Sequence, residues 1–239
     1  MSAFLYGVAL QWKLDIRSKS LLITCYVVPL LFFAIMGGIF TSILPDSKAT
    51  LIQSMTVMGV SMGALVGLPP SLVELYGSDV KKMYQANGVP LYLGLISMFL
   101  SAFLHLMLMS AILYLIAPLA FHAVVPANPP QYFGSLALFI AVSLGVGCVL
   151  GLAVKSQTRL TMITQLAFLP SIMLSGIMFP ASMLPGFLEV LGKLFPAAWG
   201  FPLMTENGFS LDNLWPLAVI LAVSVLACAL LLKRRKSEA

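Results

Sequence analysis

Six long stretches of this 239-residue chain contain no Asp, Glu, Lys or Arg. A chain needs about 20 mainly apolar residues to cross the hydrocarbon core of a membrane as an α-helix. Lipid offers no hydrogen-bond partners to an open backbone, and the apolar residues do not alternate as in a β-barrel strand, so each stretch is predicted to be helical. The sequence therefore predicts an all-α integral membrane protein, one transmembrane domain over residues 1–239, with spans at 21–44, 51–73, 91–117, 131–154, 160–180 and 213–232.

The composition excludes a soluble enzyme and a disulfide-framed secreted domain. Hydrophobic types make up 60% of the residues and charged types only 9%, where a soluble domain carries about 25% charged residues. Cys25, Cys148 and Cys228 each lie in an apolar run and are interpreted as buried small side chains. The chain has no P-loop, zinc-protease or serine-hydrolase motif, so the sequence predicts no catalytic residue, no metal site and no ATP site of its own.

The distribution of basic residues predicts the orientation. With the N-terminus in the cytoplasm, eleven of the 13 Lys and Arg lie inside, and only Lys48 and Lys193 lie outside. Such a bias marks the cytoplasmic side of membrane proteins. We therefore expect both termini to be cytoplasmic. The run Lys233–Lys236 is interpreted as a stop-transfer and headgroup anchor, so the net charge of +5 needs no nucleic-acid partner.

Residues 1–20 are too charged to span a membrane. Apolar side chains recur at helical spacing in this segment, which predicts a helix lying in the membrane interface. A simple flank leading into the first span is an equally good interpretation.

The segment 74–90 is predicted to be the main cytoplasmic loop. Ser78 can cap a short helix at about 79–86, and Asn87-Gly88 can end it. Two helical turns are too few to be stable alone in water. The apolar face formed by Val80, Met83 and Tyr84 therefore needs something to pack on. Two interpretations stay open: a docking surface for a soluble partner, and a connector lying on the membrane.

Residues 181–211 are too apolar for a solvated loop and too few to cross the membrane twice. Prolines at 185, 196 and 202 divide the segment, so short re-entrant helices between the fifth and sixth spans are predicted, and a lipid-facing interfacial hairpin is the alternative. Glu189 and Lys193 are spaced to pair across one helical turn.

Small and polar residues mark particular faces of the spans. Glycines one helical turn apart allow helices to approach closely, which predicts packing seams at Gly59, Gly63 and Gly67 and at Gly147 and Gly151. The fifth span carries a polar stripe that includes Gln165, a side chain that should face protein or water. His105, in the third span with Ser97 and Ser101, is interpreted as a hydrogen-bonded interhelical residue rather than a proton relay.

The order of these parts resembles the permease subunit of ABC-2 type transporters over essentially the whole chain. The clearest similarity lies in Ser175–Pro180 (SGIMFP), Pro185 and Phe195-Pro196, which resemble the end of the family's fifth span and its re-entrant segment. The loop from Glu74 through Gly77 and Lys82 to Pro90 is similar to the family's stretch before the third span.

This resemblance implies a division of labour between chains. Two permease chains, identical or different, form the pathway in the lipid bilayer, and a separate ATP-binding cassette subunit binds ATP and Mg. It implies coupling to that subunit through Glu74, Gly77, Asp79, Val80, Lys81, Lys82, Met83 and Tyr84. It also implies a translocation pathway at Ser61, Thr164, Gln165, Ser171 and Ser175.

The resemblance implies ATP-driven export. Because no span offers a charge to an ionic cargo, the expected substrate is hydrophobic or amphipathic, such as a drug, a peptide antibiotic or a lipid. The small size of the chain, as a single permease subunit, favours a location in a bacterial inner membrane. Two alternatives remain: a non-energised immunity protein that sequesters a toxic peptide, and a lipid-modifying membrane enzyme.

Overall fold

The computed structural model describes residues 3–77, 83–84, 86–178, 183–205 and 209–237. The elements within these residues are α-helices, two π-helical turns (η1 and η3) and one 3-10 helix (η2). In chain order they are α1 Ala3–Arg17, α2 Lys19–Leu22, η1 Ile23–Val27, α3 Val28–Ile43, η2 Pro45–Ala49, α4 Leu51–Met62, η3 Gly63–Gly67, α5 Leu68–Gly77, α7 Leu91–Phe121, α8 Pro129–Ala153, α9 Gln157–Met173, α10 Gly186–Gly192, α11 Pro196–Leu203 and α12 Leu211–Ser237.

Within the described residues, five continuous helices are long and apolar enough to cross a membrane: Ile23–Ile43, Leu51–Gly77, Leu91–Phe121, Pro129–Ala153 and Leu211–Arg235. The prediction of an all-α integral membrane protein is confirmed. The predicted span 160–180 corresponds to α9, whose 17 residues reach about 26 Å at 1.5 Å per residue. Six spans therefore stay a prediction.

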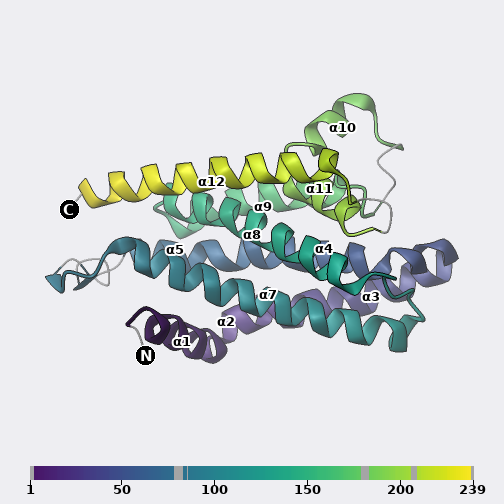
Figure 1. The fold of residues 1–239 in the computed structure, drawn as a ribbon, viewed down its shortest axis with the longest axis horizontal. Coiled ribbons are helices and arrows are strands. Elements are labelled where there is room, and N and C mark those ends of the chain that lie inside the picture. The colour runs from purple at the N-terminus through teal and green to yellow at the C-terminus, as the bar shows by residue number, and fades with distance from the viewer. Residues whose placement is uncertain (1–2, 78–82, 85, 179–182, 206–208, 238–239) are drawn as a thin grey trace.

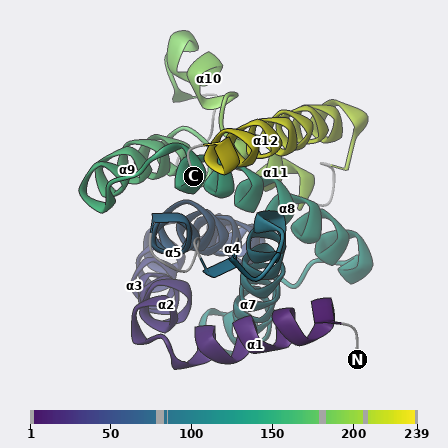
Figure 2. The same ribbon diagram turned by 90° about the vertical axis from the view of Figure 1, so that its left-hand side faces the viewer.

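The second span, formed by α4, η3 and α5, lies at the centre of the bundle. Figure 2 shows it surrounded by α3, α7, α8 and α9, and its main contacts are with α7 and α8. Polar residues accompany it there, and the hydroxyl groups of Thr56 and Tyr132 lie 2.9 Å apart in a hydrogen bond. A span that carries Gln, Ser and Thr side chains gains by placing them against protein rather than lipid.

The prolines of the second span change its pitch without ending the helix. Pro69 and Pro70 lack the backbone N–H that an α-helix needs. The preceding residues form the π-helical turn η3, in which the backbone N–H of Leu68 bonds to the carbonyl of Gly63. The helix then continues to Gly77, beyond the predicted boundary at residue 73.

The two glycine series meet different partners. A β-carbon added at Gly147 would overlap the carbonyl of Ala64, and one added at Gly151 would lie 2.8 Å from Leu72. Gly59 and Gly63 instead lie against Met109 and Leu106 of α7. Helix α8 thus approaches the second span closely at Gly147 and Gly151. Gly59 and Gly63 of the second span make room for the larger side chains of α7.

Helix α1 is separate from the first span and packs on α7. Figure 2 shows that it lies across the direction of the bundle, which is the arrangement a helix in the membrane interface needs. Helix α1 and the end of α12 lie at the same end of the bundle as the α8–α9 connection (Figure 1). That this end faces the cytoplasm stays a prediction.

The segment after α9 forms two short helices set by its prolines. Pro185 precedes α10, and Pro196 starts α11, where its missing N–H costs nothing. Helix α11 is buried against α8 and α12, whereas α10 projects from the bundle (Figure 1). The predicted pair is confirmed, with Nζ of Lys193 lying 2.8 Å from Oε1 of Glu189. A re-entrant role for this segment stays a prediction.

Candidate coupling and pathway surfaces

The predicted coupling loop is anchored at both ends. At its start, the hydroxyl of Tyr76 in α5 donates a hydrogen bond of 2.7 Å to the carbonyl of Leu91 in α7. At its end, Gly88 has a φ of +66° and the backbone N–H of Val89 bonds to the carbonyl of Tyr84 at 2.8 Å. This is the hydrogen bond of a Schellman helix end, so Asn87-Gly88 ends a helical turn as predicted.

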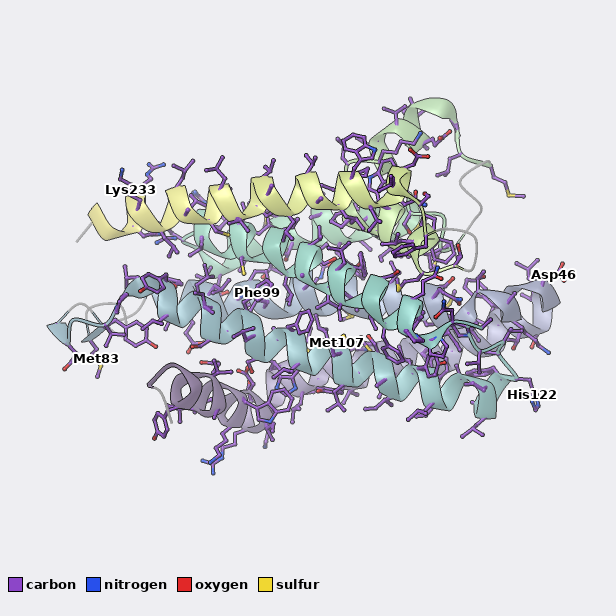
Figure 3. All side chains as sticks on the ribbon, viewed as in Figure 1. Asp46, Met83, Phe99, Met107, His122 and Lys233 are labelled. Atoms are coloured by element: carbon purple, nitrogen blue, oxygen red, sulfur yellow. The ribbon has the colours of Figure 1, made fainter. Side chains whose placement is uncertain are left out.

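The described coupling residues differ in exposure. Glu74 and Gly77 are exposed at the end of α5. Met83 is 62% exposed and lies at one end of the bundle (Figure 3). The ring of Tyr84 is partly buried and lies against Gly94 of α7. Asp79, Val80, Lys81 and Lys82 lie outside the described residues.

The predicted pathway residues are mostly buried in the single chain. Ser61, Thr164, Ser171 and Ser175 are all at most 5% exposed. The hydroxyls of Thr164 and Ser175 donate to carbonyls of their own segment, Thr161 and Ile172, at 3.1 and 2.8 Å. Gln165 differs because its side chain is exposed on α9. An amide facing lipid is costly, so Gln165 is the pathway candidate that most needs a further partner or water.

A polar cluster that joins α1 to the bundle was not predicted. Asp15 is only 7% exposed. Its carboxylate accepts a hydrogen bond of 2.8 Å from Nε2 of Gln11 and another from the hydroxyl of Ser101 in α7. A carboxylate so placed needs these donors to offset the loss of water. The spacing of Gln11 and Asp15 by one helical turn was the signal in the sequence.

His105 lies beside this cluster and connects three elements. Its Nδ1 lies 2.7 Å from the hydroxyl of Tyr26 in η1, and its ring stacks on Trp12 of α1 with centroids 4.0 Å apart and planes inclined by 10°. Its Nε2 is buried and has no hydrogen-bond partner within the described residues. The geometry agrees with the interpretation of His105 as an interhelical residue.

One arginine of the predicted headgroup anchor is buried instead. Arg235 is 8% exposed, and its guanidinium donates hydrogen bonds to the carbonyls of Leu152, at 3.0 and 3.3 Å, and Val154, at 3.3 Å. These carbonyls belong to the end of α8, where helical carbonyls have no partner in their own helix and carry partial negative charge. Arg235 therefore joins the ends of α8 and α12. Lys233, by contrast, is exposed.

The family model described as ABC-2 type transporter matches residues 3–209, from α1 to the segment before α12. The chain belongs to the ABC-2 type transporter family. It is thus a multi-pass membrane subunit of an ABC transporter, and permeases of this family generally work with an ATP-binding subunit. A comparison with curated protein sequences finds no match. Within the part of the permease that the structure describes, no group of His, Cys, Asp or Glu side chains could hold a metal ion.

Proposed function

We propose that this ABC-2 permease exports a hydrophobic or amphipathic substrate across a bacterial cytoplasmic membrane, driven by a separate ATP-binding cassette subunit. Family membership is the observation that carries the proposal. The substrate class is supported by the six uncharged stretches of the sequence, which offer no charged side chain to an ionic cargo. Cytoplasmic termini are supported by the basic residues.

Coupling is proposed to pass through the loop between α5 and α7, at residues 74–84. Met83 is exposed in the described part of the loop, and its neighbour Tyr84 lies against Gly94. Tyr76 ties the other end of the loop to Leu91. A force applied at Met83 would therefore reach both α5 and α7, the helices that border the loop.

The pathway is proposed to lie between the second span and α9, at Ser61, Thr164, Gln165, Ser171 and Ser175. Four of these side chains are closed off in the single chain. Transport then requires a second packing of the helices, in which ATP binding to the partner subunit opens the seam between α4 and α9. A second permease chain, identical or different, would cover the exposed face of α9 that carries Gln165.

The test co-expresses the permease with its ATP-binding subunit and compares two exposed methionines. Met83→Asp places a charge on the proposed contact, and Met183→Asp makes the same change after α9, where Met183 is 74% exposed. Loss of a central interface side chain typically costs about tenfold or more in affinity. We expect Met83→Asp to weaken co-purification by about that factor and to reduce stimulated ATP hydrolysis accordingly, with Met183→Asp unchanged.

Two results would contradict the proposal. Full ATPase stimulation in the Met83→Asp variant would show that coupling does not pass through this loop. Failure of the unmodified permease to capture any ATP-binding subunit would remove the energy source on which ATP-driven export depends.

A further inference from the structure

A cavity of about 370 Å³ opens between α9 and α12 at the end of the bundle that carries the chain termini. Arg159 and Ile163 of α9 line one side, and Leu231, Arg234 and Arg235 of α12 line the other. Lys155, in the α8–α9 connection, completes the wall. The cavity thus combines four basic side chains with apolar walls.

The cationic character of this cavity is built into the fold. Arg235 is held in the wall by its hydrogen bonds to the carbonyls of Leu152 and Val154. Lys155, Arg159 and Arg234 are exposed around it. The residues lining the cavity, all within the described part of the chain, include no Asp or Glu. Four positive charges gathered around one space repel one another, so an anion placed among them is favoured.

The start of α9 adds to this preference. Ser156 caps α9 and lines the cavity, but its side chain makes no capping hydrogen bond. The first N–H groups of a helix have no partner in the helix and carry partial positive charge. They therefore support the same anion that the basic side chains attract.

Apolar surface leads away from the cavity along both helices. On α9, Leu166 follows Ile163 by about one turn and is exposed. On α12, Val223 precedes Leu231 by about two turns and is exposed as well. Residues three apart, as on α9, or eight apart, as on α12, fall within one broad apolar stripe of a helix. The site is thus complementary to a molecule with an anionic head and long apolar tails.

We propose that this cavity binds the phosphate of an anionic phospholipid, whose acyl chains lie along α9 and α12. Basic pockets between transmembrane helices recognise lipid headgroups in this way. The bound lipid would bridge the α8–α9 connection to the end of α12 and so hold α9 against the bundle. The proposal depends on the membrane location of the chain and not on export or on the ATP-binding subunit, so the two proposals can fail separately.

The test measures lipid binding to the purified permease in a neutral detergent. Phosphatidylglycerol and phosphatidylcholine with identical acyl chains are titrated, and binding is followed by native mass spectrometry and by the shift in Tm. Inorganic phosphate is titrated as the free anion. The variant Arg159→Gln/Arg234→Gln removes two charges from the cavity, and Lys233→Gln removes one from the same end of α12 but outside this cavity.

We expect phosphatidylglycerol to bind more tightly than phosphatidylcholine. Each basic residue near an anionic lipid surface contributes roughly a fivefold factor in affinity, so the double variant should bind phosphatidylglycerol about 25-fold more weakly. Lys233→Gln should bind like the unmodified chain. If the double variant has a lowered Tm without lipid, the exposed single variant Lys155→Gln, with an expected loss of about fivefold, replaces it.

Several results would overturn the proposal. Equal binding of the two lipids would remove the preference for an anion. Undiminished binding of phosphatidylglycerol by the double variant would place any lipid site elsewhere. An equal Tm shift with inorganic phosphate alone would assign the cavity to the free anion. Unchanged lipid binding together with weaker capture of the ATP-binding subunit would assign it to an acidic segment of that subunit.

Discussion

Replacing Gly147 by alanine tests the closest approach of two helices in this permease. An ideal β-carbon at Gly147 would overlap the Ala64 carbonyl oxygen and lie 3.1 Å from its carbonyl carbon. Because the obstacle is backbone, no side chain can rotate away, so α8 must move from the second span. Overpacking costs about 1–3 kcal/mol, and a rigid neighbour places this change near 3 kcal/mol.

The expected effect is large enough to measure by thermal unfolding in detergent. For a chain of this size, 1 kcal/mol corresponds to about 2–4 °C in Tm. Gly147→Ala should therefore lower the Tm by about 6–12 °C. Gly134→Ala is the matched control because Gly134 lies in the same helix, and an added β-carbon there meets nothing within 4 Å. That variant should match the unmodified permease or exceed it slightly, since alanine favours helix.

A Tm for Gly147→Ala equal to that of Gly134→Ala would refute this reasoning. It would show that α8 and the second span can separate without loss, and that the Gly147–Gly151 seam does not hold the bundle together.

Two further predictions concern the contacts of α1 and η1. Asp15→Ala removes the acceptor for two hydrogen bonds and should destabilise the docking of α1 by about 1–3 kcal/mol. The variant should therefore be cleaved faster by a protease near residue 18 than the exposed control Asp46→Ala. Equal rates of cleavage in the two variants would contradict this prediction. Tyr26→Phe leaves Nδ1 of His105 without its partner and should lower the Tm by about 2–12 °C, from a cost of about 1–3 kcal/mol. The exposed Tyr6→Phe is its control, and an unchanged Tm in Tyr26→Phe would show that the bond contributes nothing.

The spans could be predicted because the signal is local. An uncharged, mainly apolar run of about 20 residues is long enough to span the membrane, whatever other segments it packs against. The boundaries were less predictable, since they depend on backbone conformation. Helix α9 ends at Met173 and is followed by Gly176 with a φ of +85°, a left-handed conformation that interrupts the predicted span. The second span runs through Pro69 because a π-helical turn precedes it.

The buried charges could not be predicted because their environment is assembled from distant segments. Asp15 is buried only when α1 packs beside Ser101. Arg235 belongs to a basic run that the sequence alone assigns to lipid headgroups, and only the packing of α12 on α8 brings it to the carbonyl of Leu152. In the coupling loop, likewise, the sequence predicts that Met83 and Tyr84 lie on one apolar helix face. In the structure Tyr84 is less exposed than Met83 because its ring contacts Gly94 of α7.

The two π-helical turns, Ile23–Val27 and Gly63–Gly67, lie against each other, since a β-carbon at Gly67 would be 3.4 Å from Sγ of Cys25. A π turn holds about one residue more than an α turn. Rewinding Gly63–Gly67 as an α-helix would rotate α5 by about 100° and shift it by about 1.5 Å. Tyr76 would then face away from Leu91. The rotation of α5 about its axis, and with it the direction in which the chain enters the coupling loop, therefore depends on whether Gly63–Gly67 is wound as a π turn or as an α turn.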